Sequence, residues 1–330
     1  MGKINQSITE LVGRTPLLQL NGYQKKFDVK ANIIGKLEYF NPNQSVKDRI
    51  ALAMVEDAEQ KGLLKPGDTI VETTSGNTGI GLAAIAAAKG YPFRVYIQDQ
   101  VSEERFKVIK AFGGTTIKLT EEPAIAKTLE ETNGDFVAAI KSLKEEVVSK
   151  EENTFFVDQC SNPANPAVHK RTTGPEIWED TDGKVDILVA CAGTGGTISG
   201  TGAFLKEKNP NIKIVGVQPG PNSLPSPEVP APEKEITGVH PFVGVADNLV
   251  PSTLDRHIYD EYIAVEAVDA HQAARDVART DGILVGESSG AALFAARTLA
   301  AKEENKGKNI VVIFPDTGLR YLSTGLFDEQ

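Results

Sequence analysis

Short apolar runs alternate with longer segments of helical character along most of the chain. Ile187–Cys191 and Asn309–Phe314 are nearly all aliphatic and fit buried strands, whereas 78–89 is long and alanine-rich and fits a helix. The expected strands are 32–37, 69–72, 93–97, 115–119, 154–157, 187–191, 213–217 and 309–314. The expected helices are 49–61, 78–89, 103–112, 197–208, 270–281 and 290–303, with a polar helical stretch at 125–150. This alternation predicts an α/β fold with mainly parallel sheets.

Length and composition indicate a folded protein of roughly two domains without a membrane span or signal peptide. The 330 residues are 40 % hydrophobic and 24 % charged, which is ordinary for a globular protein. The net charge of −10 argues against a surface that binds nucleic acid or anionic membranes. Cys160 and Cys191 form no CxxC pair, and the four histidines lack metal-ligand spacing. We therefore expect a reduced, cytoplasmic protein without a metal site.

Three turns rich in glycine and hydroxyl residues stand at the expected starts of helices, at 73–79, 193–197 and 286–290. A helix N-terminus carries unpaired N–H groups and the positive end of the helix dipole, so such turns bind anions. Two of them together predict two anionic groups in one cleft, although each turn alone is equally explained as a helix cap. The spacing matches neither GxxxxGKS/T nor GxGxxG, because Ile198 stands where a third glycine belongs.

The segment 41–49 places a lysine at the expected start of a helix. With Ser45 as the helix cap, Lys47 lies in the first turn, where the positive dipole end disfavours a cation. A lysine amine kept neutral can form a Schiff base and later move protons. A solvated surface charge is the alternative interpretation of Lys47.

Six segments together resemble the cysteine synthase family, the pyridoxal-phosphate enzymes of fold type II, with cystathionine β-synthase as a close cousin. The segments are NPNQSVKDR, ETTSGNTGIGLA, SNPANPAVHKRTTGPEIWEDTDGKVD, AGTGGT, GESSGAA and PDTGLRYLST. The resemblance runs from about Ile8 to about Thr324 and implies two α/β domains with mainly parallel sheets. The small N-terminal domain would cover 41–161, and the large cofactor-binding domain would cover 1–40 and 162–330. It further implies a homodimer.

The resemblance also implies a role for each matching residue. Lys47 would hold pyridoxal 5'-phosphate as an internal aldimine and then take the α-proton of the substrate. Asn77 would contact the ring hydroxyl oxygen, and Ser288 would face the pyridine nitrogen. The residues that would bind the cofactor phosphate are Gly193, Thr194, Gly195, Gly196 and Thr197. The residues that would bind the carboxylate of the amino-acid substrate are Thr74, Ser75, Gly76, Thr78 and Gln159.

The implied reaction is a β-replacement. A neutral Ser288 stabilises a pyridinium less than a carboxylate would, so loss of the α-proton is coupled to departure of the β-substituent. Elimination to an aminoacrylate, followed by addition of sulfide, would convert O-acetyl-L-serine into L-cysteine and acetate, a step of cysteine biosynthesis. Closure of the small domain would exclude water.

Three segments depart from the family pattern. Cys160 follows Gln159 where many relatives carry phenylalanine, which either enlarges the pocket wall or is a neutral packing change. The stretch 244–251 replaces a glycine-rich GIGAGFIP and places Asp247 where it would act as a general base, cap a turn or point to solvent. The stretch 98–102 differs from the usual MPETMS on the acceptor side. Hence an alternative is L-cysteine as donor, with release of hydrogen sulfide and formation of serine, cystathionine or lanthionine.

A hypothesis of another class is a non-catalytic binding protein of the same fold. The presence of Lys47, Asn77 and Ser288 together weighs against it. Partners expected from the resemblance are small amino acids and the C-terminal tail of serine acetyltransferase, which the carboxylate turn would accept. Neither nucleic acid nor a membrane is expected.

Overall fold

The computed structural model describes residues 4–328 except 75, 98–102, 133–135 and 227–233. The chain divides into two compact units, which are described separately. Unit 1 comprises Met1–Val12 and Lys47–Asn165, and unit 2 comprises Gly13–Val46 and Pro166–Gln330. The domain boundaries expected from the resemblance, 41–161 for the small domain and 1–40 with 162–330 for the large one, remain a prediction. Among the described helices, none has both the length and the apolar content that crossing a bilayer requires.

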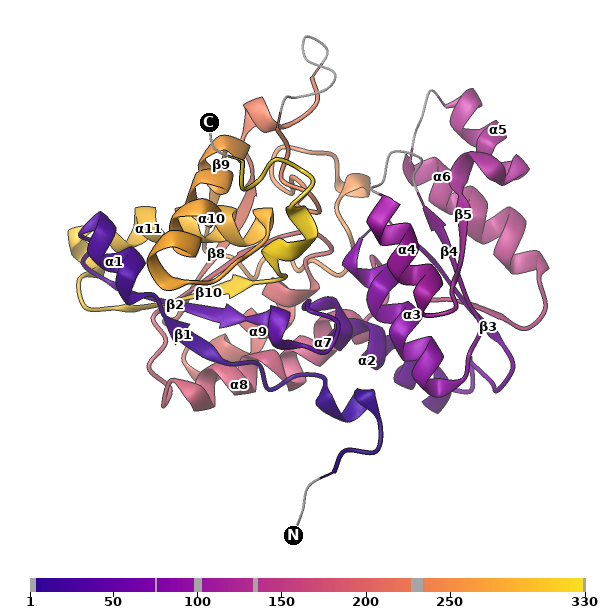
Figure 1. Ribbon diagram of the computed structural model, residues 1–330, viewed down its shortest axis with the longest axis horizontal. Coiled ribbons are helices and arrows are strands. Elements are labelled where there is room, and N and C mark those ends of the chain that lie inside the picture. Colours follow the sequence, from indigo (N-terminus) through magenta and orange to yellow (C-terminus); the bar gives the residue numbers. More distant parts are fainter. Residues whose placement is uncertain (1–3, 75, 98–102, 133–135, 227–233, 329–330) are drawn as a thin grey trace. The chain divides into compact units, whose positions relative to one another are not determined.

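Unit 1 is built on a four-stranded parallel sheet (Figure 1). Its strand order is β5 (Thr115–Lys118), β4 (Phe93–Ile97), β3 (Thr69–Thr73) and β6 (Thr154–Phe156). Strand β3 lies inside this sheet. The turn that follows β3 therefore lies at the carboxyl edge of an inner strand, which is where parallel α/β sheets place their ligands.

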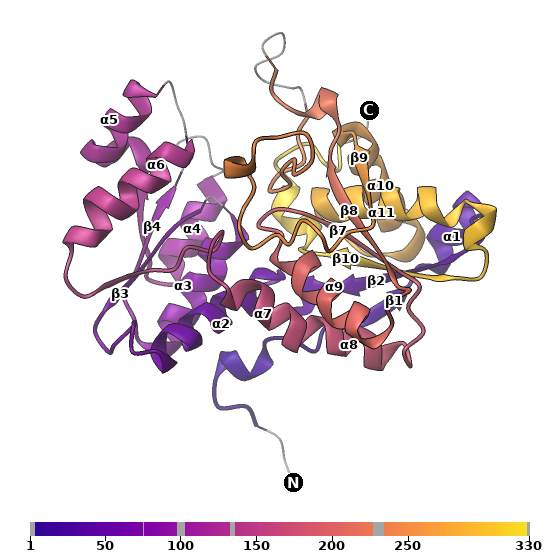
Figure 2. The ribbon, with the colours of Figure 1, turned by 180° about the vertical axis from the view of Figure 1, so that it is seen from behind.

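Helices cover both faces of this sheet, as Figures 1 and 2 show. One face carries α2 (Lys47–Gln60), α3 (Asn77–Lys89) and α4 (Glu103–Ala111). The other carries α5 (Pro123–Glu131) and α6 (Phe136–Ser142), followed by a π-turn at Leu143–Val147 and a 3-10 turn at Val148–Lys150. Helix α3 is apolar on nearly all sides and is buried from Thr78 to Ala86, as expected for a helix inside a core.

Unit 2 contains a six-stranded sheet, parallel except at one edge. The strand order is β1 (Leu17–Gln19), β2 (Asn32–Leu37), β10 (Asn309–Phe314), β7 (Ile187–Cys191), β8 (Lys213–Pro219) and β9 (Glu261–Val265). Only β1 runs antiparallel to its neighbour. The pairing of β2 with β10 places Asn32 opposite Asn309, so the sheet joins the two ends of the chain.

Two hydrophobic cores fill the two faces of this sheet. Helices α1 (Asn21–Phe27), α10 (Ala267–Asp281) and α11 (Glu287–Ala300) cover one face, and α8 (Thr173–Asp180) and α9 (Gly196–Lys208) cover the other (Figures 1 and 2). The chain passes from unit 1 to unit 2 within α7 (Ala164–Arg171).

The predicted alternation of strands and helices is confirmed, and β2, β4, β7 and β10 have the predicted bounds. The polar stretch 125–150 is divided into α5, α6 and the two short turns after them. Five elements were missed because they are short or largely polar: β1, α1, α7, α8 and β9. Their formation depends on packing that a local pattern does not record.

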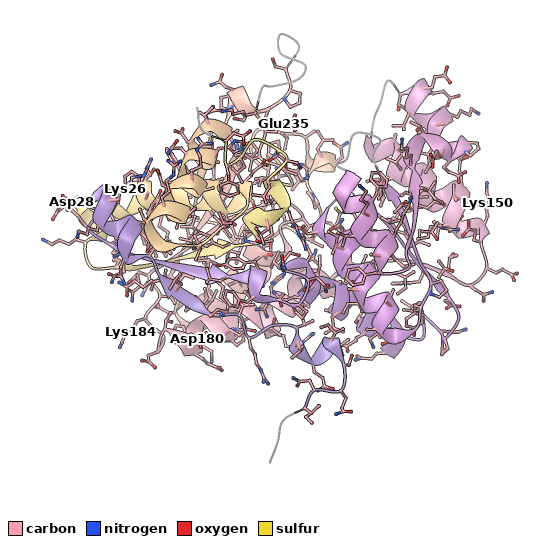
Figure 3. All side chains as sticks on the ribbon, viewed as in Figure 1. Lys26, Asp28, Lys150, Asp180, Lys184 and Glu235 are labelled. Carbon is pink, nitrogen blue, oxygen red and sulfur yellow. The ribbon has the colours of Figure 1, made fainter. Side chains whose placement is uncertain are left out.

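Charged side chains lie mainly on the outside of each unit. Figure 3 labels six exposed charged residues of both signs: Lys26, Asp28, Lys150, Asp180, Lys184 and Glu235. The buried charged residues include Lys36, Glu38, Asp48, Arg49 and Glu72. Because burying a charge is costly unless it is paired, the contacts of these groups identify where polar structure was kept inside.

Candidate functional site

Helix α2 begins at Lys47, so the lysine occupies the first turn, as the sequence predicts. Its side chain is half-buried. In unit 2, the segment just before it is held by the end of β10: Val46 N donates to Pro315 O at 2.7 Å, and Ser45 forms an isolated antiparallel bridge with Asp316. In unit 1, a Cβ on Gly81 would lie 3.2 Å from Lys47 O, so the glycine lets α3 approach this first turn closely.

The turn between β3 and α3, residues 74–78, is named the carboxylate turn after the ligand that the sequence predicts for it. Thr74 Oγ1 accepts a hydrogen bond from Gly76 N at 3.2 Å, and α3 begins at Asn77 with Thr78 as its second residue. The backbone N–H groups of a helix start and the threonine hydroxyls of this turn are donors of the kind that bind an anion. Ser75, predicted to take part, lies outside the described residues.

Gln159 joins this turn from a distant part of the sequence. Thr78 Oγ1 donates to Gln159 Oε1 at 2.5 Å, so two of the residues predicted to bind the carboxylate are in direct contact. Asn165 Nδ2 donates to Gln159 O at 2.8 Å and anchors the backbone of this residue.

Glu72, the second-last residue of β3, is a residue that the sequence reasoning missed. Its side chain is 1 % exposed. Glu72 Oε1 accepts from Thr73 N at 2.8 Å, and Oε2 accepts from Gln159 N at 3.0 Å. Burial raises the pKa of Glu72 to about 8, against the lowering effect of the two backbone N–H groups. The available signal was an acidic residue within an otherwise apolar strand pattern.

The turn at 193–197, the phosphate turn, connects β7 to α9 in unit 2. Gly195 precedes α9 with φ +80°, and a Cβ there would lie 2.8 Å from Leu254 Cδ1. A Cβ on Gly193 would lie 2.6 Å from Gly238 O. Side chains at either position would close the space at the start of α9, so the turn keeps its backbone accessible to a phosphate. Gly196 and Thr197 are the first two residues of α9. These residues fit the cofactor phosphate that the resemblance implies.

Hydroxyl groups complete this turn. Thr253 Oγ1 donates to Thr194 O at 2.6 Å. Thr197 Oγ1 lies 3.3 Å from His169 Nε2, and Thr173 Oγ1 lies 2.8 Å from His169 Nδ1. The buried imidazole therefore bridges the phosphate turn to α8.

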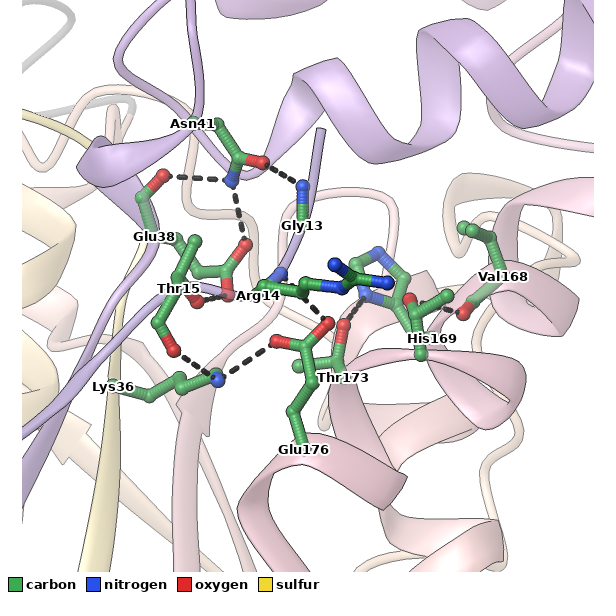
Figure 4. A network of polar contacts seen from close by, with 11 residues as sticks. Gly13, Arg14, Thr15, Lys36, Glu38, Asn41, Val168, His169, Thr173 and Glu176 are labelled. Carbon is green, nitrogen blue, oxygen red and sulfur yellow. Dashed lines mark hydrogen bonds and ion pairs between the residues drawn. The ribbon is translucent and has the colours of Figure 1, made fainter. Parts of the chain in front are cut away.

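A network of buried charge lies beside this imidazole (Figure 4). Lys36 Nζ donates to Thr15 O at 2.6 Å and to Glu176 Oε2 at 2.8 Å. Arg14 N donates to Glu176 Oε1 at 3.0 Å, and Thr15 Oγ1 donates to Glu38 Oε1 at 2.7 Å. The network fastens residues 14–15 to α8 and so stabilises unit 2.

Ser288 is the second residue of α11 and is buried. Cys191 Sγ donates to Ser288 O at 3.2 Å, which ties the start of α11 to the end of β7, the strand that leads into the phosphate turn. Glu287 Oε2 accepts from Thr237 N at 2.8 Å, and Glu287 Oε1 lies 3.6 Å from His271 Nε2. The start of α11 is thus tied to the strand that leads into the phosphate turn.

Asp247 begins a 3-10 turn, Asp247–Leu249, and its side chain is 91 % exposed. It forms an ion pair with Arg256. Cys160 is half-buried, and burial raises the pKa of its thiol to about 12. The stretch 98–102 lies outside the described residues. Within the described ranges, no three His, Cys, Asp or Glu side chains are grouped so that they could hold a metal ion.

Comparison with known proteins places this geometry in context. A family model described as pyridoxal-phosphate dependent enzyme matches residues 8–316. The chain is 44 % identical to a cysteine synthase of Staphylococcus aureus over 323 residues, which is 97 % of this chain and 96 % of that protein.

Two solved structures are similar to the chain over nearly its whole length. O-acetyl serine sulfhydrylase isoform 3 from Entamoeba histolytica is similar with a TM-score of 0.84 and 38 % identity, over 99 % of this chain and 93 % of that one. A hydrogen sulfide-producing enzyme from Fusobacterium nucleatum is similar with a TM-score of 0.84 and 37 % identity, over 98 % and 99 % of the two chains.

Proposed function

The chain belongs to the pyridoxal-phosphate-dependent enzymes and is cysteine synthase-like over nearly its whole length, and from this premise we propose that it converts O-acetyl-L-serine and sulfide into L-cysteine and acetate. Membership in the family confirms the resemblance, the α/β fold and the cofactor class that the sequence predicted. The choice of donor and acceptor is the new part of the statement.

The observation that carries the proposal is the link in unit 2 between the phosphate turn and Ser288. The phosphate turn offers backbone N–H groups to one end of a cofactor, and Ser288 stands beside the same strand end, fixed through Cys191. A hydroxyl and an anion site supported by one strand suit a ligand that carries both a phosphate and a ring nitrogen.

When bound, pyridoxal phosphate supplies an electron sink for bond breaking at the substrate Cα. Lys47 Nζ would hold the cofactor and, once the substrate amine has displaced it, would accept the α-proton as the free amine. Asn77 and the neutral Ser288 hydroxyl orient the cofactor ring through hydrogen bonds. The carboxylate turn and Gln159 bind the α-carboxylate, which fixes the Cα–H bond relative to Lys47.

A second candidate function is release of hydrogen sulfide from L-cysteine. It is favoured by the similarity to the hydrogen sulfide-producing enzyme of Fusobacterium nucleatum. Asp247 was the predicted general base for this route, and its exposed, Arg256-paired carboxylate gives the route no support.

The same proposal covers assembly and setting. We expect a homodimer in the cytoplasm, and the C-terminal tail of serine acetyltransferase would bind through its carboxylate at the carboxylate turn. Sedimentation of the holoenzyme measures the oligomeric state, and sedimentation with a synthetic peptide of that tail measures binding of the peptide.

The test compares products from defined donors. Holoenzyme with O-acetyl-L-serine and sulfide is expected to form L-cysteine and acetate, and Lys47→Ala is expected to abolish this. The matched control is Lys61→Ala, at the residue that follows the same helix, where the lysine is exposed and paired with Asp57. Asp247→Asn is expected to leave L-cysteine formation unchanged.

Other outcomes assign other functions. Formation of hydrogen sulfide from L-cysteine, with no product from O-acetyl-L-serine, would establish the second candidate instead. O-phospho-L-serine and L-serine are assayed alongside as donors. Cofactor-loaded protein that transforms none of these amino acids would be a binding protein of this fold.

A further inference from the structure

Glu72 occupies a position where a carboxylate is expensive. It is the second-last residue of β3, an inner strand of the unit 1 sheet, and is 1 % exposed. Burying a carboxylate costs free energy unless hydrogen bonds compensate for the lost water. Burial accordingly raises the pKa of Glu72 to about 8. An apolar residue would fill the same place at lower cost, so the carboxylate must contribute through its contacts.

Those contacts join two segments that are far apart in the sequence. Oε1 accepts from Thr73 N at 2.8 Å, at the entrance to the carboxylate turn. Oε2 accepts from Gln159 N at 3.0 Å. The residue before Gln159, Asp158, has φ +56°, a conformation that costs a non-glycine residue energy. Glu72 thus holds the strand end and the strained turn in one fixed arrangement.

The arrangement continues to the side chains proposed to bind the carboxylate. The backbone N–H of Gln159 is bound by Glu72, and its backbone carbonyl is bound by Asn165. Its side-chain Oε1 then accepts from Thr78 Oγ1 at 2.5 Å. Glu72 itself is buried, and each of its two carboxyl oxygens accepts from a backbone N–H group. It therefore acts through Gln159 and does not itself bind substrate.

We propose that Glu72 is the positioning residue of the amino-acid carboxylate site, acting through Gln159 and Thr78. This inference rests on the proposed function only in that the ligand is an α-amino acid whose carboxylate binds at the carboxylate turn.

Glu72→Gln tests the proposal with little change of shape. The amide has one accepting oxygen, so its NH₂ group must face one of the two backbone N–H donors. Holoenzyme is titrated calorimetrically with L-alanine, which carries the α-carboxylate but no leaving group, and with L-alaninamide, which lacks the carboxylate. We expect L-alanine to bind about tenfold more weakly to Glu72→Gln and L-alaninamide to bind unchanged, since one buried hydrogen bond contributes on this scale.

The matched control is Glu59→Gln, on α2 of the same unit. Glu59 accepts from Lys89 Nζ at 2.7 Å and from Tyr91 Oη at 2.9 Å, away from the carboxylate turn. Both ligands are expected to bind this variant as they bind the wild type. In a Gln159→Ala background, Glu72→Gln is expected to add little, because the effect passes through Gln159.

Equal L-alanine affinity in Glu72→Gln and wild type would overturn the proposal, and so would a parallel loss of L-alaninamide. If Glu72→Gln does not fold, Glu72→Asp carries the test: the shorter side chain cannot span both amides, and the same selective loss is expected. A chain that makes no L-cysteine yet shows this selectivity would refute the proposed function and leave the inference standing.

Discussion

Replacing Gly195 by alanine tests whether the phosphate turn is held open by backbone geometry. Gly195 has φ +80°, and an added Cβ would lie 2.8 Å from Leu254 Cδ1 and 2.9 Å from Leu254 Cα. The left-handed conformation costs an L-residue about 1–2 kcal/mol. Overpacking against a buried neighbour costs about 1–3 kcal/mol more. The free energy of unfolding of unit 2 is therefore expected to fall by about 2–5 kcal/mol.

Two further glycines separate these contributions. Gly282, the C-cap of α10, has φ +71° with no atom within 4 Å of an added Cβ, so Gly282→Ala is expected to cost only the backbone term of about 1–2 kcal/mol. Gly193→Ala meets Gly238 O at 2.6 Å and is expected to cost the steric term of about 1–3 kcal/mol.

Urea unfolding of cofactor-free protein measures all three, because removing the cofactor excludes stabilisation by binding. The single tryptophan, Trp178, lies on α8 of unit 2 and reports this unit by fluorescence. If Gly195→Ala costs no more than Gly282→Ala, the clash with Leu254 does not occur and the reasoning fails. Pyridoxal phosphate affinity, measured on the same variants, is expected to fall for Gly195→Ala and Gly193→Ala only.

Three further predictions concern buried ionisable groups. Burial raises the pKa of Cys160 and of Cys191 to about 12, so at pH 8 both thiols are expected to react with iodoacetamide roughly a thousandfold more slowly than in urea; comparable rates would contradict this. Lys36→Met removes the ammonium group that donates to Glu176 and is expected to cost about 3 kcal/mol in urea unfolding, whereas a loss below about 1 kcal/mol would show that solvent compensates. Burial lowers the pKa of His271, so below about pH 6.5 the unfolded chain binds a proton that the folded chain does not, and the free energy of unfolding falls. Between pH 7.5 and 5.5, His271→Gln is therefore expected to lose less stability than the wild type. An equal loss in the two proteins would refute this.

Local pattern was sufficient for buried strands and for the start of α2. Asn309–Phe314 has five consecutive apolar residues between turn signals, and such a run is typical of a buried parallel strand. Lys47 was placed in the first turn because Ser45, two residues before it, is a typical helix-cap residue. Strand order could not be predicted, because the pairing of β2 with β10 leaves no trace in either segment alone.

The candidate site likewise contains residues that the sequence could predict and residues that it could not. The glycine-rich turns were visible because left-handed and closely packed positions demand glycine. Glu72 was missed because its partners are backbone N–H groups, one of them on distant Gln159, and backbone groups carry no sequence signature. The environment of Asp247 was equally hidden, since its pairing with Arg256 depends on how the intervening loop folds.

The pairing of β2 with β10 also orders events during synthesis. Every strand of the unit 1 sheet lies between Thr69 and Phe156, so this sheet can close once that contiguous stretch has left the ribosome. The sheet of unit 2 must wait for Asn309–Phe314, the strand that joins β2 to β7. Until then β2 and β7 expose unpaired edges, and contacts of such long sequence separation form slowly. Unit 2 is therefore the part of the nascent chain that depends most on protection from aggregation.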